Sequence, residues 1–177
     1  MKRFPPVATL ILTALLSAFT RGQTLDEYQV KAAFLYNFVK FVEWPPQVFK
    51  SPTDRIGICI LGQDLFGGAL DDAVRGKTFE GRMFVVPRIS EVRQAGGCQI
   101  LFVSASESKR VQAILAELEA SSILTVGETE GFAAQGGVID FRLEAGKVRF
   151  RVNVDAAERA RLKISSKLLS LAQLVKK

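Results

Sequence analysis

The sequence predicts an α/β fold, a three-layer sandwich whose mostly parallel sheet carries a C-terminal antiparallel hairpin at one edge. Two observations predict it. Short apolar runs rich in β-branched residues, such as 55–61 and 99–103, alternate with segments of helical periodicity, as is typical of parallel strands joined by crossover helices. Near the end, 138–143 and 148–152 alternate apolar and polar residues on either side of the turn 144–147, which predicts a hairpin.

Local signals place the elements along the chain. A capping box at 24–27 begins the first helix, and the prolines at 45–46 end it by about residue 42. A second capping box, at 104–107, begins a helix directly after a buried strand. The expected helices cover about 24–42, 63–75, 90–94, 104–120, 154–161 and 165–176. The expected strands cover about 55–61, 83–86, 99–103, 123–126, 138–143 and 148–152.

The first 22 residues are expected to be a signal peptide, which leaves 23–177 as one domain. Lys2 and Arg3 precede an apolar run from Val7 to Phe19, which is too short to span a bilayer of about 30 Å as a helix. A retained membrane anchor is the alternative. Because the segment holds three basic residues and no acidic one, its removal lowers the formal net charge from +6 to +3. The remaining basic residues are scattered, so no nucleic acid partner is expected.

The residue types do not favour an enzyme. The chain has no histidine, which excludes histidine triads, histidine metal ligands and the usual proton carrier at neutral pH. Ser106 and Lys109 have the spacing of a nucleophilic serine–lysine pair, but its companion motifs are missing, and we interpret them as part of a helix start. The glycine pair 136–137 indicates a turn, and the acidic pairs 71–72 and 128/130 are expected to be solvated. We therefore expect no catalytic residue, no metal and no cofactor.

Cys59 and Cys98 are the only cysteines of the sequence. In an exported protein an even number of cysteines favours a disulfide, and two buried free thiols are the alternative. By the chain-entropy model, closing the loop between them would stabilise the fold by roughly 4 kcal/mol.

Four segments of the expected domain carry motifs that occur together in one known family. They are 27–46 (EYQVKAAFLYNFVKFVEWPP), 98–104 (CQILFVS), 124–139 (LTVG at its start, GGVI at its end) and 150–169 (FRVN at its start, LKISSKLL at its end). In this order, and over essentially the whole expected domain, they resemble the YfiR family of bacterial periplasmic proteins.

The resemblance implies a periplasmic regulator. Members of that family hold a membrane-bound diguanylate cyclase inactive by binding its periplasmic sensor domain, and an outer-membrane lipoprotein can sequester the repressor. The released cyclase raises cyclic di-GMP and biofilm formation. Other members sit beside other membrane sensors. The resemblance therefore implies an inner-membrane partner, a diguanylate cyclase or a kinase, with an outer-membrane lipoprotein or a second copy of the chain as further partners.

The resemblance also places Cys59 and Cys98 at one of the family's disulfide positions. Redox-responsive members have a second cysteine pair, at positions that align with Ala133 and Asp140. Because that pair is missing here, the resemblance implies a structural disulfide and puts a redox switch in doubt.

The aromatic residues are concentrated in and just after the first helix, where 22 residues hold 7 of the 16. One domain core needs only one face of such a helix, so the excess indicates a partner or homodimer surface, for which aromatic side chains are typical anchors. The alternative is that the helix is buried on both sides within its own domain. Phe41, Trp44 and Phe49 are the candidate partner-binding residues.

A second function class stays open on the sequence alone. An α/β sheet offers a cleft at the carboxyl ends of its strands, here near Gly62 and Ser104, and a small-ligand-binding module would use it. The partner-binding protein is the leading hypothesis.

Overall fold

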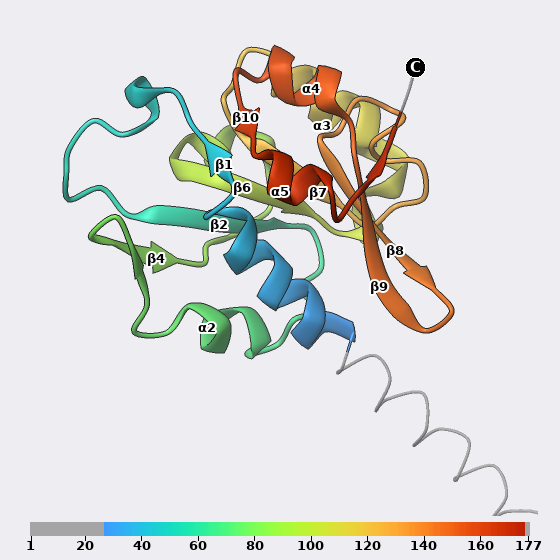
Figure 1. Ribbon diagram of the computed structural model, residues 1–177, viewed down its shortest axis with the longest axis horizontal. Coiled ribbons are helices and arrows are strands. Elements are labelled where there is room, and N and C mark those ends of the chain that lie inside the picture. The colour runs from blue at the N-terminus through green and yellow to red at the C-terminus, as the bar shows by residue number, and fades with distance from the viewer. Residues whose placement is uncertain (1–26, 176–177) are drawn as a thin grey trace, which may run out of the picture.

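The structure is a computed structural model that describes residues 27–175 (Figure 1). The expected signal peptide and most of the first capping box lie outside these residues, so the domain boundary at residue 22 stays a prediction. Among residues 27–175, no helix has the length and apolar character needed to cross a membrane.

A mostly parallel sheet forms the centre of the fold. Five parallel strands lie in the order β4, β2, β6, β7 and β8, so the chain starts inside the sheet, adds one strand outward and then crosses back, as in a doubly wound fold. Their bounds are β2 (Ile56–Leu61), β4 (Arg82–Val85), β6 (Cys98–Val103), β7 (Leu124–Gly127) and β8 (Ile139–Glu144). The antiparallel β9 (Lys147–Val152) follows β8 through the predicted hairpin turn. The predicted fold class is confirmed.

Short strands extend this sheet and form a second one. In the main sheet, β3 (Thr78–Phe79) pairs with β4, β5 (Arg88–Ile89) pairs with β2, and β11 (Gln173–Leu174) pairs with β9. A separate two-stranded sheet joins β1 (Val42–Glu43) to β10 (Lys163–Ile164).

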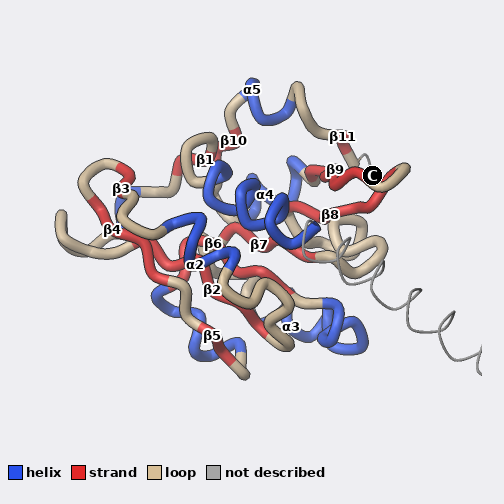
Figure 2. The backbone as a smooth tube through the Cα atoms, turned by 90° about the horizontal axis from the view of Figure 1, so that it is seen from below, coloured by secondary structure: helices blue, strands red, loops and turns tan. Residues whose placement is uncertain are grey.

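Helices cover both faces of the sheet. The N-terminal helix, 27–38, crosses one face, and α3 lies on the other; Figure 2 shows α3 and α5 on opposite sides of the strands. The α-helices that follow the N-terminal helix are α2 (Ala69–Val74), α3 (Val111–Glu117), α4 (Val154–Arg159) and α5 (Ser166–Leu169). The 3-10 helices are η1 (Pro46–Val48), η2 (Val92–Gly97) and η3 (Ala105–Arg110).

Alternation along the central strands divides the core in two. On β2, Ile58 and Ile60 face the N-terminal helix, while Cys59 and Leu61 face α3. All of them are at most 1% exposed, because a central parallel strand is buried on both faces.

Two predicted helix boundaries are wrong at their ends. The first helix stops at residue 38 rather than at about 42, because Val42 and Glu43 pair with β10 and the Phe41 carbonyl accepts a hydrogen bond from the Ser165 amide. The helix predicted over 63–75 is only α2, because Gly67 takes a left-handed φ of 57° just before it.

The helix predicted over 165–176 is also wrong. It ends at Leu169, and the chain then runs along the edge of β9 as β11, with the Val175 amide donating to the Val152 carbonyl. Leu168 is buried, but Leu171 is 67% exposed. Backbone hydrogen bonds to the free edge of β9 set the conformation of this segment. Such bonds leave no periodic pattern in the sequence. As a result, β11 is the edge strand on this side of the sheet, next to β9 of the hairpin.

Candidate partner-binding groove

The small sheet formed by β1 and β10 places the aromatic segment that follows the first helix. Val42 is opposite Ile164 and Glu43 is opposite Lys163, so the chain leaves the helix in an extended conformation. Pro45 continues it at φ −61° and ψ 143°, and η1 then turns the chain. The segment is therefore held on both sides of Trp44.

Phe41, Trp44 and Phe49 line one groove of about 510 Å³. The structure thus brings together the three residues that the sequence singled out as partner-binding. Each is half-buried. The groove is also lined by charged and polar groups, from the same segment (Lys40 and Glu43) and from other parts of the chain (Glu80, Arg82 and Gln99).

Arg82 fixes one wall of the groove. Its guanidinium lies 4.1 Å from the centre of the Phe49 ring, and its Nη1 donates to the carbonyls of Ser51 at 2.7 Å and Asp54 at 3.0 Å. Because these bonds hold the cation in place over the ring, Phe49 has a defined orientation.

Trp44 carries an unused donor. Its Nε1 is buried and has no hydrogen-bond partner among residues 27–175. The chain's own atoms cover this nitrogen, and an unpaired buried N–H costs about 1–3 kcal/mol.

The aromatic residues of the first helix itself belong mainly to the core. Phe38 and Tyr28 are buried, and Phe34 packs on Phe150 at 5.3 Å between ring centres. Tyr36 packs on Phe84 at 5.4 Å. Phe41, Trp44 and Phe49 also contact this core, so their half-buried rings serve the domain on one side and face the groove on the other.

The two cysteines form a disulfide. Cys59 and Cys98 lie on the adjacent strands β2 and β6, with their Cα atoms 5.7 Å apart, within the range that a disulfide allows. Both are buried, at 1% and 4% exposure. The structure thus supports the disulfide that the sequence predicted.

Ala133 and Asp140, the positions at which the family resemblance would place a second cysteine pair, are also neighbours. The Ala133 amide donates to Asp140 Oδ2 at 3.2 Å, and Arg151 forks onto both carboxylate oxygens of Asp140. The hydrogen bond to Asp140 raises the pKa of Arg151 above its ordinary value. A buried ion pair therefore occupies the place of the missing cystine.

A second buried polar cluster, which the sequence did not reveal, lies at the carboxyl end of β7. Glu128 was expected to be solvated, but its side chain is only 6% exposed. It accepts from Lys31 Nζ at 2.7 Å, from the Tyr28 hydroxyl at 2.9 Å and from the Ala105 amide at 3.0 Å. Burial, then the charge of Glu128 and the hydrogen bond to it, raise the pKa of Tyr28 above its ordinary value. The cluster joins the N-terminal helix to the sheet.

The crevice at the carboxyl ends of β2 and β6, where a doubly wound fold usually binds its ligand, is filled by η3. Ser106 Oγ accepts from the Gln63 amide at 2.9 Å, and a Cβ added to Gly62 would lie 2.5 Å from that oxygen. Ser104 is 1% exposed. The position that the sequence offered for a small ligand is therefore occupied by the protein's own side chains.

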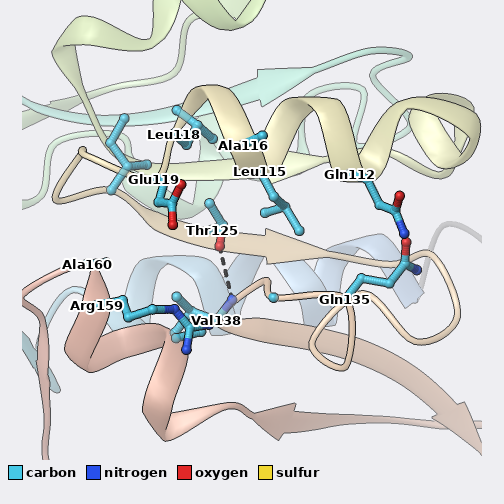
Figure 3. A pocket seen from close by; sticks show the side chains of 13 residues that line it. Gln112, Leu115, Ala116, Leu118, Glu119, Thr125, Gln135, Val138, Arg159 and Ala160 are labelled. Atoms are coloured by element: carbon cyan, nitrogen blue, oxygen red, sulfur yellow. Dashed lines mark hydrogen bonds between the residues drawn. The ribbon is translucent and has the colours of Figure 1, made fainter.

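A hollow of about 320 Å³ lies instead between α3 and α4 (Figure 3). Gln112 and Gln135 point toward one another at one end, and Glu119 and Arg159 lie toward the other. Thr125, deeper in, already accepts a hydrogen bond from the Val138 amide at 3.0 Å. Within residues 27–175, no three histidine, cysteine, aspartate or glutamate side chains are grouped as a metal site would need.

Comparison with known proteins gives a family and a fold. The model of the YfiR/HmsC-like family matches residues 28–173. A crystal structure of a conserved domain protein from Vibrio cholerae O1 biovar El Tor is similar at a TM-score of 0.56 and 9% identity, over 84% of this chain and 60% of that one. The L-Trp-bound ABC domain of a Streptococcus pneumonia protein has a TM-score of 0.49 and 9% identity, over 68% of this chain and 56% of that one.

These similarities support different conclusions. At 9% identity the Vibrio structure shows the fold alone, and this chain spans 60% of its length. No curated protein sequence matches the chain significantly. The family match, in contrast, covers nearly all described residues.

Proposed function

This chain belongs to the YfiR/HmsC-like family, and we propose that it is a periplasmic regulatory binding protein that represses a membrane-bound signalling protein, such as a diguanylate cyclase, through the periplasmic sensor domain of that protein. The family match supports the regulatory role. The disulfide fits an oxidising compartment such as the bacterial periplasm. The proposal involves binding and assigns no catalytic step to the chain.

The groove of Phe41, Trp44 and Phe49 is the observation that carries the proposal to particular residues. Aromatic anchors in a partly dry concave site are typical of the residues that dominate protein–protein affinity. The β1–β10 pairing orders the segment before binding, which lowers the entropic cost of docking.

The experiment is capture of the membrane partner by purified protein from membranes of the source organism, with Trp44→Ala as the test variant. Truncating a central aromatic anchor costs about 2 kcal/mol of binding, which is roughly a thirtyfold loss of affinity. The matched control is Tyr36→Ala, because Tyr36 is also a half-buried aromatic on the same core but does not line the groove.

Both variants lose packing, so affinity is compared per folded molecule. We expect Trp44→Ala to weaken capture by about thirtyfold and Tyr36→Ala by less than about threefold, at similar losses of melting temperature. Equal capture by Trp44→Ala and the unchanged protein would place the partner on another surface. Capture of a second copy of the chain alone would make the groove a homodimer contact.

A further inference from the structure

The hairpin of β8 and β9 projects beyond the sheet to which it belongs. β7 pairs with β8 only at Ile139 and Asp140, and β11 pairs with β9 only at Arg151 and Val152. The residues between these pairings, 141–150, therefore form a two-stranded ribbon, with no neighbouring strand on either side in the described part of the chain, 27–175. Figure 1 shows this ribbon on the opposite side of the molecule from β1.

The two faces of the ribbon differ because side chains alternate along each strand. One face packs against the N-terminal helix, where Phe38 lies 5.9 Å from Phe141 and 5.3 Å from Phe150, between ring centres. The other face carries only charged side chains. Three of them are basic, Arg142, Lys147 and Arg149, and one is acidic, Glu144. These are half-buried or exposed, with the Arg142 and Glu144 side chains at 36% and 40% exposure.

Positive charge on this basic face is largely uncompensated. Arg142 lies directly opposite Arg149, and like charges directly opposite one another destabilise a strand pair. Glu144 forms an ion pair with Arg142 at 3.7 Å and accepts a hydrogen bond from Gln173 Nε2 at 3.4 Å. No ion pair among residues 27–175 includes Arg149 or Lys147, although Lys147 is opposite Glu144 in the register. The nearby Arg151 is already taken by Asp140. The fold therefore holds an unfavourable pair of cations on an open ribbon.

We infer that the basic face, Arg142, Lys147 and Arg149, is a second docking surface and that it receives an acidic segment of a partner protein. A guanidinium group matches a carboxylate bidentately, and a carboxylate placed between Arg142 and Arg149 removes the repulsion that the free protein carries. The inference is independent of the Trp44 groove.

A membrane surface fits the ribbon less well. Lipid binding combines apolar side chains that enter the bilayer with basic ones that meet the headgroups. Here the exposed Leu143 and its partner Val148 point to the opposite face from the arginines, because their positions alternate. A flat bilayer could contact one set or the other, but not both.

The test uses a fluorescein-labelled decaglutamate peptide as the acidic probe and fluorescence anisotropy as the measurement, at about 50 and 150 mM salt. The test variant is Arg142→Gln with Arg149→Gln. The control is Arg75→Gln with Arg93→Gln, which removes the same charge from two exposed arginines on other elements. We expect the ribbon variant to weaken binding at least about tenfold and the control less than about twofold.

Equal weakening in both variants would mean that only net charge is felt, and would overturn the inference. Absence of peptide binding at the lower salt would also overturn the inference. So would binding of the unchanged protein to phosphatidylglycerol vesicles but not to the peptide, if the ribbon variant loses that vesicle binding. The ribbon variant should melt at or above the temperature of the unchanged protein, because it removes a repulsion. Trp44→Ala should bind the peptide normally, so failure of this inference and failure of the proposed function are distinguishable.

Discussion

The two faces of the sheet are stabilised in different ways. The face under the N-terminal helix is packed with aromatic rings, including a chain of contacts from Tyr28 to Phe66 and from Phe66 to Phe102, at 5.2 and 4.9 Å between centres. The face under α3 holds mainly aliphatic side chains and the disulfide. One face therefore depends on many interchangeable ring contacts, and the other on a covalent link.

Phe132 shows how tightly the second face is fitted. It is 0% exposed and is seated against two glycines; a Cβ at Gly127 or at Gly137 would lie 2.4 or 2.1 Å from its ring. No comparable restriction applies to the rings of the first face, where Phe34, Phe41, Trp44 and Phe49 remain half-buried. The aromatic face can thus present rings to a partner, whereas the α3 face has none to spare among the residues that cover it.

Removal of Phe38 tests the aromatic face and should give the largest effect. Its ring is 0% exposed and stacks near Phe34, Phe141 and Phe150 at 6.0, 5.9 and 5.3 Å. Phe38→Ala leaves a cavity that the surrounding rings fill only in part, so we expect a loss of about 3–5 kcal/mol in the free energy of unfolding, measured in urea.

Val30→Ala is the control on the same helix, because Val30 is 38% exposed; it should change stability by less than about 0.5 kcal/mol. A loss below about 1.5 kcal/mol in Phe38→Ala would show that the neighbouring rings move in to fill the space, and that this face is looser than its packing indicates.

The disulfide tests the opposite face. Its loop spans 39 residues, and the chain-entropy model gives roughly 4 kcal/mol for a loop of this length, with about 2–4 kcal/mol typical of measured bridges. We expect reduction, or Cys59→Ala with Cys98→Ala, to lower the free energy of unfolding by about 2–4 kcal/mol in urea.

Partner capture should survive this change, since the bridge lies under α3 and does not line the Trp44 groove. Loss of capture by folded, reduced protein at unchanged secondary structure would instead make Cys59–Cys98 a redox switch. The Asp140–Arg151 ion pair, at the place of the second cystine, gives no redox response of its own.

Periodicity and composition predicted the parts of this fold that are buried. The central strands are continuous apolar runs in the sequence because both of their faces are covered. The β8–β9 hairpin instead alternates apolar and polar residues because one of its faces is not covered. Long-range pairing of exposed backbone was missed. The β1–β10 sheet and β11 are two-residue strands whose partners lie far away in sequence or at a sheet edge, so no local pattern marks them.

The candidate site was likewise predictable only where a local sequence pattern marks it. Trp44-Pro45-Pro46 marks a rigid turn after an aromatic helix, and this local signal brought Phe41, Trp44 and Phe49 forward. Glu128 had no such signal: its burial comes from Lys31, 97 residues away, which reaches it only once the helix crosses the sheet. Charged residues in a loop usually stay solvated, so only the folded chain distinguishes Glu128 from Glu130.

Alkaline pH should act on the helix face through Tyr28, with the smallest of the three effects. The buried phenol donates to Glu128 Oε2 at 2.9 Å, and its pKa is raised in the fold. Below the ordinary tyrosine pKa of about 10, the hydroxyl is protonated in both states and its contribution is complete. Above it, the unfolded chain loses the proton first, so stability falls as pH rises toward the folded-state pKa.

Tyr28→Phe keeps the ring against Phe66 and removes the ionisable group. At neutral pH it should be less stable than the unchanged protein by about 1 kcal/mol, because Glu128 loses one donor but keeps Lys31 and the Ala105 amide. Between about pH 10 and 11 the difference should shrink by roughly 1 kcal/mol, as linkage requires for one proton. Urea unfolding of both proteins across this range measures it. A difference that stays constant would mean that Tyr28 ionises as easily in the fold as in the unfolded chain, and that solvent reaches the Glu128 cluster.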